Sequence, residues 1–301
     1  MIEDTKKRST VSLVLGSGGA RGLAHIGVIE VLEEHGFAIE SISGASMGAL
    51  IGGIYASGKL EDYRNWVCAL ETFDLLRLLD FSFSGSAIFK GEKIIHTLKE
   101  LIGARNIEDL PISFTAVATE LERGKELWFS KGPLFDAIRA SIAFPTIFSA
   151  VEFEGRTLVD GGLMNPIPIA PTLHDITDLT IAVSLSGKRG EQRSQPQPAA
   201  SPPIPSGNRY HRMVVEFIDS LQKKTNGKHE DSGFFEIISR SIDVMQNNIV
   251  RFMLAAYSPD ILIEIPKDCC TIYEFDRAKE LIEIGHKQAE QAVQSFLRKK
   301  N

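Results

Sequence analysis

The pentapeptide GASMG, residues 44–48, places Ser46 between Gly44 and Gly48. It matches G-x-S-x-G, the pattern of a sharp strand-to-helix turn that lifts a serine hydroxyl above a sheet, where it can attack an acyl carbonyl. Average glycine and serine usage produces this pattern by chance in roughly one chain of this length in six to ten. The pentapeptide therefore makes Ser46 a candidate nucleophile that needs independent support.

A second glycine cluster, GSGGARG, covers residues 16–22 between an apolar run and a helical pattern. Backbone N–H groups of such a loop point at whatever lies at the helix N-terminus, where negative charge is favoured. A dinucleotide loop requires glycine at position 21, which is arginine, and a P-loop requires Gly-Lys-Ser/Thr, which is absent. An oxyanion hole for a tetrahedral intermediate fits the spacing. A tight turn without a ligand is the alternative.

A serine nucleophile also needs a base, and none of the seven histidines stands in a motif that would supply one. His25 falls within a helical pattern whose neighbours are apolar, which favours a structural role. Asp160, in LVDGGLMNP, ends a predicted strand and precedes Gly161 and Gly162, which let a backbone or substrate come close. An isolated Asp-Gly-Gly is most often only a turn. No clustered His/Asp/Glu spacing predicts a metal site.

Strands alternate with helical segments along the chain, as in an α/β sheet flanked by helices. Val11–Leu15 is predicted to be a buried parallel strand, and residues 23–36 a helix that stops on a glycine. A short strand over 39–43 leads into GASMG, and the small apolar residues that follow predict a helix packed close to the sheet. Ser46 thus has the strand-turn-helix context that a nucleophile requires.

The later part of the chain continues this alternation and then changes composition. Its predicted elements are a strand pair over 112–121 and 125–130, a helix over 132–148 broken at Pro145, a hairpin over 151–162 with its turn at Glu154-Gly155, a strand over 179–187, helices over 210–224 and 234–257, a strand over 260–266 and a helix over 275–299.

Composition predicts a globular chain that can bury a core without disulfides or structural metal ions: it has 301 residues, of which 43% are hydrophobic and 24% charged. We predict an N-terminal tail over 1–10, a core over 11–187, and a helical part over 209–301 that completes the same domain. Residues 188–208 are rich in Pro, Gln and Ser and predict a disordered insertion. The insertion and the helix over 210–224 together could form a movable lid, although an ordinary core-facing helix is the alternative.

Charge and cysteine usage exclude several classes of protein. A formal net charge of −6 argues against a nucleic-acid partner. Cys68, Cys269 and Cys270 match neither a disulfide framework nor a metal spacing, which favours small packing residues in a reducing compartment. No apolar run reaches the roughly 18–20 residues that span a bilayer. We therefore expect a cytoplasmic protein whose membrane contact is at most transient and peripheral, at the inner face.

Three segments together, GSGGARG, GASMG and SIAFPTIFSAVEFEGRTLVDGGLMNPIP, closely resemble the patatin-like phospholipase family, in particular its bacterial branch similar to neuropathy target esterase. The resemblance covers Val11 to Ser186 in the family's order. It implies a three-layer α/β/α fold with a mainly parallel central sheet. It also implies a calcium-independent acyl hydrolase without cofactors, which cleaves carboxylic esters of lipids through a Ser-Asp dyad and an acyl-enzyme.

Carried over residue by residue, the resemblance makes Ser46 the nucleophile and Asp160 the general base. Gly18 and Gly19, with the amide of Met47, would form the oxyanion hole. Ser17 stands where the family's loop has its first glycine, and Arg21 either positions the loop or attracts a phosphate head group. The remaining motif and positioning residues are Gly16, Gly22, Gly44, Gly48, Gly161 and Gly162.

Two rival functions remain open from the sequence. One is a catalytically silent regulatory or lipid-binding protein that keeps the same fold. The other is an anion- or nucleotide-binding module built on the glycine loop, which the loop spacing disfavours. Hydrolysis of a short p-nitrophenyl ester, measured also for Ser46→Ala, would separate an enzyme from either rival.

Overall fold

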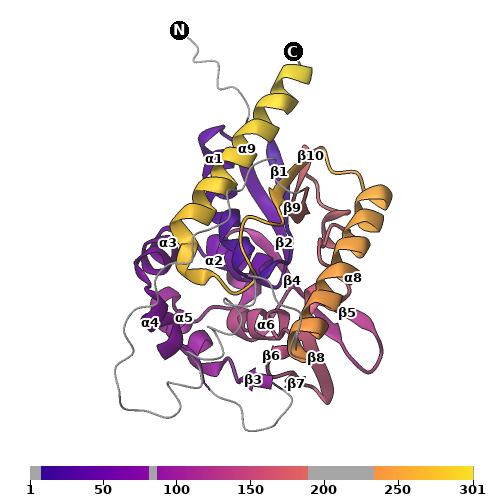
Figure 1. The fold of residues 1–301 in the computed structure, drawn as a ribbon. Helices are drawn as coiled ribbons and strands as arrows, with labels where there is room; N and C mark the ends of the chain where they lie inside the picture. The colour runs from indigo at the N-terminus through magenta and orange to yellow at the C-terminus, as the bar shows by residue number, and fades with distance from the viewer. Residues whose placement is uncertain (1–7, 81–86, 189–233, 301) are drawn as a thin grey trace.

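An eight-stranded mixed sheet organises the chain in the computed structural model, which describes residues 8–80, 87–188 and 234–300 (Figure 1). Its strands follow the order β10-β9-β1-β2-β4-β8-β7, and β5 pairs with β4. A separate two-stranded sheet joins β3 to β6. The strand bounds are β1 (Thr10–Leu15), β2 (Ala38–Ala45), β3 (Ala87–Phe89), β4 (Ser113–Glu120), β5 (Lys125–Phe129), β6 (Thr146–Phe148), β7 (Val151–Phe153), β8 (Arg156–Asp160), β9 (Leu179–Gly187) and β10 (Ile261–Pro266).

The strands β10, β9, β1, β2 and β4 run parallel to one another. Strands at the centre of a parallel sheet are covered on both faces, so they need continuous apolar runs rather than alternation. In β1, the five residues from Val11 to Leu15 are all buried. The hairpin β7-β8 and strand β5 join this sheet antiparallel. The predicted mainly parallel sheet is therefore confirmed, with an antiparallel extension at one edge.

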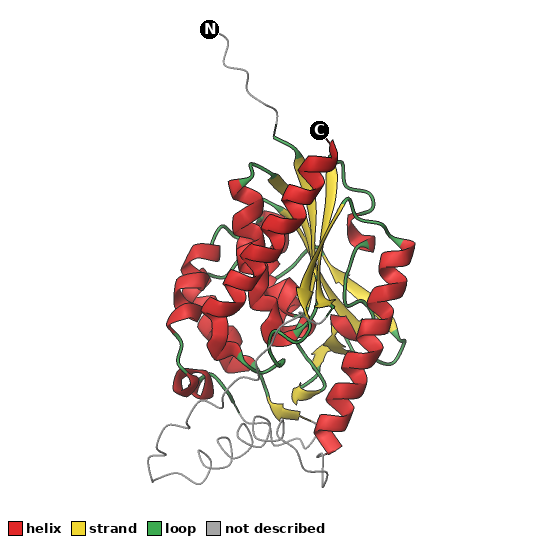
Figure 2. Cartoon of the chain, turned by 45° about the horizontal axis from the view of Figure 1, so that its top comes forward, coloured by secondary structure: helices red, strands yellow, loops and turns green. Residues whose placement is uncertain are grey.

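Helices cover both faces of the sheet, which confirms the three-layer architecture (Figure 2). In both views α8 lies on one side of the sheet, and α1, α2, α3, α5 and α9 lie on the other. The α-helices are α1 (Ala24–Glu34), α2 (Met47–Ala56), α3 (Leu60–Ala69), α4 (Thr72–Arg77), α5 (Glu92–Ile102), α6 (Leu134–Ser141), α8 (Phe234–Ala256) and α9 (Ala278–Lys300). Short 3-10 helices are η1 (Gly19–Leu23), η2 (Ile107–Asp109), η3 (Gly161–Leu163), η4 (Ala170–Thr172) and η5 (Phe275–Arg277).

Several sequence expectations differ from the structure or lie outside the described residues. The helix expected over 132–148 ends at Ser141, because Pro145 disfavours helical backbone at the residue before it and Thr146–Phe148 instead forms β6 against β3. Residues 57–111, for which no element is predicted above, contain α3, α4, β3 and α5. The expected helix over 210–224 and the insertion beyond Lys188 lie outside the described residues.

The three cysteines, all within the described residues, form no disulfide, and Cys269 and Cys270 are buried in the main apolar core. This agrees with the packing role expected of them.

The helices α1 and α9 cross with their backbones in direct contact. A Cβ atom on Gly27 of α1 would lie 2.0 Å from the Ile282 carbonyl oxygen, and one on Gly285 of α9 would lie 2.0 Å from the Ala24 carbonyl oxygen. Real Cβ atoms never come so close to backbone, so only glycine at both positions permits this spacing. The contact holds α9 against α1, in the same helical layer.

We predict that Gly285→Ala lowers the free energy of unfolding by about 1–3 kcal/mol, because the added methyl group forces α1 and α9 apart. The loss should occur although alanine favours helix over glycine by about 1 kcal/mol. Urea unfolding measures it. The control, Ser295→Ala on the exposed side of α9, should change stability by less than about 0.5 kcal/mol. Equal stability of Gly285→Ala and wild type would contradict the close contact.

Candidate active site

Ser46 occupies the turn between β2 and α2 with a backbone conformation that is rare for a residue with a side chain. Its φ and ψ are 55° and −123°, and α2 begins at the next residue. Such strained residues persist only where their surroundings hold them. The Ser46 amide donates to the Ser141 hydroxyl at 2.9 Å, and its carbonyl accepts from the amides of Ala49 and Leu50. The predicted strand-turn-helix context of Ser46 is present.

Asp160 ends strand β8 and lies directly against Ser46. The Ser46 hydroxyl donates to Asp160 Oδ2 at 2.6 Å, and the Gly162 amide donates to Asp160 Oδ1 at 2.7 Å. The backbone of Asp160 is held as well, since its amide donates to Ala143 and its carbonyl accepts from the Thr119 hydroxyl. Oδ2 is thus directed at the Ser46 hydroxyl and Oδ1 at the Gly162 amide.

The Asp160 side chain is fully buried, and burial raises its pKa from 3.8 to about 7. The hydrogen bonds from Ser46 and Gly162 favour the ionised form and act in the opposite direction, but they are the smaller effect. A carboxylate with this pKa is a far stronger base than an exposed aspartate, and both of its protonation states are populated near neutral pH.

The three motifs meet where glycine leaves room. A Cβ on Gly22 would lie 2.3 Å from Met47 Cβ, so the glycine loop rests on the residue after Ser46. A Cβ on Gly162 would lie 2.3 Å from Ser17 Oγ, so the turn after Asp160 rests on the same loop. Close contacts of this kind surround every other predicted motif glycine in the three segments, namely Gly16, Gly18, Gly19, Gly44, Gly48 and Gly161.

Some amide groups of the glycine loop and of the α2 N-terminus have no hydrogen-bond acceptor among the described residues. The amides of Ser17 and Ala20 donate to backbone carbonyls and fix the flanks of the loop. Between them, the N–H groups of Gly18 and Gly19 find no acceptor among the described residues, and neither does that of Met47, the first residue of α2. A helix begins with amides that have no intrahelical acceptor and carries partial positive charge there.

Arg21 is buried, and its guanidinium bonds to other groups of the protein. Its Nε donates to the Gly18 carbonyl at 3.1 Å, and it pairs with Asp243 of α8 at 3.0 Å. It also reaches the Lys267 carbonyl. Of the two roles that the sequence leaves open, these contacts favour positioning of the loop over capture of a head group.

None of the described histidines is hydrogen-bonded to Ser46. His25 is fully buried and bonds through Nε2 to the Gly16 carbonyl at 2.8 Å, and burial lowers its pKa to about 4. A neutral ring in this position donates to the glycine loop and supports it. The others lie elsewhere: His35, His96 and His286 pair with glutamates, and His174 is exposed. His211 and His229 lie outside the described residues.

Several residues around the site are not identified by the sequence. Ser141 receives the Ser46 amide and donates to the Val117 carbonyl, and Thr119 holds the Asp160 carbonyl. Asp243 and Gln246 approach the glycine loop and the turn after Asp160 from α8. Ser141 lies in the segment SIAFP, which is part of the resemblance, so the sequence did offer a signal for this residue. The other three are separated from the motifs in sequence and join them only through the sheet and α8.

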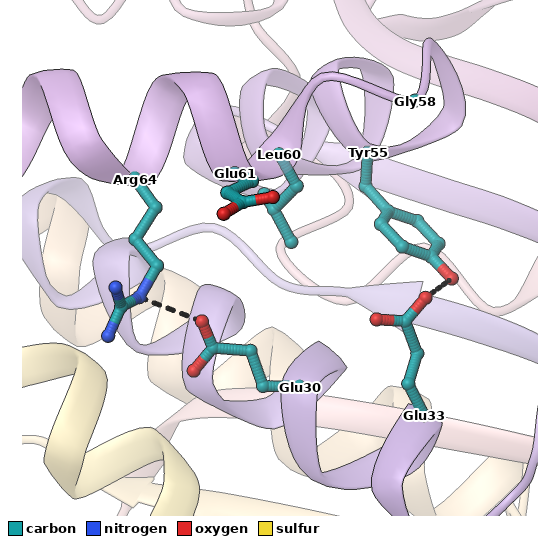
Figure 3. A pocket seen from close by; sticks show the side chains of 7 residues that line it. All are labelled: Glu30, Glu33, Tyr55, Gly58, Leu60, Glu61 and Arg64. Atoms are coloured by element: carbon teal, nitrogen blue, oxygen red, sulfur yellow. Dashed lines mark hydrogen bonds and ion pairs between the residues drawn. The ribbon is translucent and has the colours of Figure 1, made fainter.

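One surface hollow lies away from this site. It has a volume of about 400 Å³ and is lined by residues of α1, α2, α3 and the turn before α3, including Tyr55 at the end of α2 opposite Ser46 (Figure 3). Two pairs of its side chains already bond to each other, since Tyr55 donates to Glu33 and Arg64 pairs with Glu30, each at 2.8 Å. We assign it no chemistry.

Two further findings concern only the described residues. No group of three or more His, Cys, Asp or Glu side chains there could hold a metal ion. Among the helices of these residues, none combines the length and the hydropathy that crossing a bilayer requires.

The sequence matches the family model of the patatin-like phospholipases over residues 13–173. An NTE family protein of Mycobacterium tuberculosis is 38% identical over 95% of this chain and 92% of its own length. The neuropathy target esterase sws of Drosophila melanogaster is 29% identical over 56% of this chain and 12% of its own. The lysophospholipase nte1 of Emericella nidulans is 31% identical over 53% of this chain and 11% of its own.

A solved structure shows the same fold. The crystal structure of VipD from Legionella pneumophila superposes with a TM-score of 0.50 over 96% of this chain and 67% of that one. The two sequences are 15% identical over this match, so the likeness concerns the fold alone.

We predict that Asp160→Asn removes a pH-dependent cost to stability. A carboxyl with a raised pKa in the folded state contributes stability below the unfolded value of 3.8 and loses it as the pH rises through about 7. The full loss corresponds to about 4 kcal/mol, and asparagine does not titrate. Urea unfolding at about pH 4 and about pH 8 should therefore show a larger fall for wild type than for Asp160→Asn.

The matched control for this measurement is Asp136→Asn on α6, whose exposed carboxyl should leave the wild-type trend unchanged. Parallel pH dependence of wild type and Asp160→Asn would show that Asp160 titrates normally.

Proposed function

The chain belongs to the patatin-like phospholipase family, and we propose that it is a calcium-independent serine acyl hydrolase that cleaves carboxylic ester bonds of lipids. One observation carries the proposal: the 2.6 Å hydrogen bond from the Ser46 hydroxyl to the buried Asp160 carboxylate. The printed names of relatives, an esterase and a lysophospholipase, support a lipid ester as substrate. No cofactor is required by the chemistry that follows.

In the first step, Asp160 accepts the Ser46 proton while the serine oxygen attacks the ester carbonyl carbon. The carbonyl electrons move to oxygen and produce a tetrahedral oxyanion. The amides of Gly18, Gly19 and Met47 are the donors that we assign to this oxyanion, and the α2 N-terminus adds partial positive charge. Because the donors are fixed by the backbone, little reorganisation accompanies the change in charge.

Collapse of the oxyanion breaks the bond to the leaving alcohol, which receives the proton from Asp160. The acyl group remains on Ser46. A water molecule then attacks the acyl-enzyme while Asp160 again accepts a proton, and the second collapse releases the fatty acid and returns the proton to Ser46. Every proton transfer is assigned to Asp160, so the proposal requires neither histidine nor a metal ion.

We further propose that residues 11–187 and 209–301 form one catalytic domain. Pairing of β10 with β9 and the crossing of α9 over α1 support this, because both join the later segment to the sheet that carries Ser46. A cytoplasmic location with peripheral membrane contact is also proposed.

We predict that Ser46→Ala and Asp160→Asn each lower kcat/KM for p-nitrophenyl butyrate by at least about 10³-fold, measured in EDTA without added metal. The first variant removes the nucleophile and the second the base. Ser57→Ala, at the other end of α2, is the control for loss of a buried serine hydroxyl and should stay within about threefold of wild type.

A histidine variant separates the dyad from a triad. His25→Gln, which keeps a side-chain donor toward Gly16, should retain substantial turnover provided that it folds. An inactive His25→Gln beside an active Asp160→Asn, or activity that requires added calcium, would overturn the mechanism. Unchanged activity in Ser46→Ala would exclude Ser46 as the nucleophile, and a wild type without hydrolysis would leave a lipid-binding or regulatory role.

The pH dependence of turnover provides a second test. Since the base must be ionised to accept the serine proton, kcat/KM should rise about tenfold per pH unit below the Asp160 pKa of about 7 and level off above it. Initial rates between about pH 5 and about pH 9 measure the profile, with tryptophan fluorescence as a check that the protein stays folded. A flat profile through neutral pH would mean that the base titrates at an ordinary aspartate value.

A further inference from the structure

The peptide group between Gly18 and Gly19 carries one of the amides that we assign to the oxyanion. Its carbonyl belongs to Gly18 and its N–H to Gly19. No cis peptide bond occurs among the described residues, and in a trans peptide the C=O and N–H groups point in opposite directions. Whatever holds the Gly18 carbonyl therefore also sets the direction of the Gly19 N–H.

Steric preference alone does not hold this peptide in one orientation. Glycine adopts positive and negative φ about equally readily, and Gly19 lies in the left-handed region with a φ of 56°. A larger residue cannot replace Gly18, because its Cβ would lie 2.6 Å from Leu185 Cδ1. The same holds for Gly19, where a Cβ would lie 2.6 Å from the Ile272 carbonyl oxygen. The orientation of the peptide therefore depends on hydrogen bonds.

The side chain of Arg21 supplies such a hydrogen bond. Its Nε donates to the Gly18 carbonyl at 3.1 Å, and its Nη2 pairs with Asp243 Oδ1 at 3.0 Å. The guanidinium group is a rigid plane. Since two of its nitrogens are held at once, the bond to Asp243 fixes the position from which Nε reaches Gly18.

Asp243 of α8 is the counter-charge that keeps Arg21 in this place. The guanidinium is buried, and a buried charge is costly without a partner of opposite sign. Among the carboxylates of the described residues, Asp243 is the one that forms an ion pair with Arg21. Its other oxygen accepts from Asn247 Nδ2 at 3.1 Å, one turn later on the same helix. Both oxygens of the carboxylate are therefore held.

We propose that Asp243 is a positioning residue of the oxyanion hole. Acting through Arg21, it holds the Gly18 carbonyl and so keeps the Gly19 N–H turned toward the oxyanion. The proposal rests on the proposed function, because it concerns the donors assigned there. It adds a residue of α8, a helix that lies beyond the segment 13–173 matched by the family model.

Turnover of p-nitrophenyl butyrate tests the consequence for catalysis. In Asp243→Asn the guanidinium of Arg21 loses its counter-charge and gains by turning toward water, which releases the Gly18 carbonyl. We expect kcat and kcat/KM both to fall about tenfold, because a donor to the oxyanion acts in the transition state and not in the bound substrate. Asp243→Glu keeps the charge and should stay within about threefold of wild type.

A double-mutant cycle shows whether Asp243 acts through Arg21. Arg21→Met removes the donor to Gly18, and the further change Asp243→Asn should then lower kcat by less than about twofold. Losses that multiply in the double variant would overturn the proposal, because Asp243 would then act independently of Arg21.

Carbonyl NMR shifts report on the peptide itself, without any measurement of activity. When glycine alone carries ¹³C in its carbonyl and ¹⁵N in its amide, an HNCO spectrum shows only Gly-Gly peptides, which occur in this sequence at 18–19, 52–53 and 161–162. In Asp243→Asn the carbonyl signal of 18–19 should move upfield, because its oxygen loses a hydrogen-bond donor. The signal of 52–53, inside α2, should stay in place.

Two variants assign these signals. Gly53→Ala identifies the signal of 52–53 by its loss. Asp160→Asn identifies that of 161–162 by the largest shift, since the Gly162 amide donates to Asp160.

The matched control is Glu30→Gln, which removes a helix carboxylate from its ion pair with Arg64 at 2.8 Å, away from the site. It should leave kcat within about twofold of wild type and the 18–19 carbonyl signal unmoved. Rates are compared at a temperature at which circular dichroism shows every variant folded.

The outcomes separate this proposal from the proposed function. If the wild type hydrolyses the ester while Asp243→Asn keeps its kcat, or keeps the 18–19 carbonyl signal in place, the positioning role is overturned and the proposed function stands. A folded wild type without hydrolysis would remove the proposed function, and with it the oxyanion hole that Asp243 is proposed to position.

Discussion

The carboxylate of Asp160 is removed from water on every side, and a charge so buried is tolerated only with the few donors that surround it. Those donors are the Ser46 hydroxyl and the Gly162 amide, so in the proposed mechanism the nucleophile also stabilises the charge of the base. The same burial that costs stability gives the carboxylate its basicity. Much of the surrounding structure serves to keep this pair together and dry.

Ser46 and Asp160 follow strands that are not neighbours in the sheet, and the backbone at the strand ends, rather than long side chains, brings them together. Strand β4 separates β2 from β8, yet Ser46 and Asp160 meet because each stands at the end of its strand and turns toward the other. Support also comes from outside the segment that the family model matches, since Asp243 and Gln246 reach the site from α8. The proposed Ser46-Asp160 dyad thus depends on elements drawn from most of the described chain.

Sequence patterns predict much of this arrangement but not all of it. Buried parallel strands such as β1 and β9 are mostly apolar runs, and clusters of glycine mark tight turns. Both can therefore be recognised from a short stretch of sequence. The meeting of Ser46 with Asp160 required the resemblance, because spacing along the chain does not give strand order. Thr119 and Gln246 carry no local signal, and their roles arise only when the sheet and α8 assemble.

The crossing of α1 and α9 through Gly27 and Gly285 also has a consequence for biosynthesis. About 250 residues separate the two helices, and at ribosomal rates of roughly 5–20 residues per second the first waits roughly 10–50 s for the second. During that time the side of α1 that α9 covers in the finished fold, around Ala24 and Gly27, has no permanent cover. The nascent chain is therefore exposed to aggregation in this interval, and molecular chaperones that shield apolar helices would determine how much of it reaches the native state.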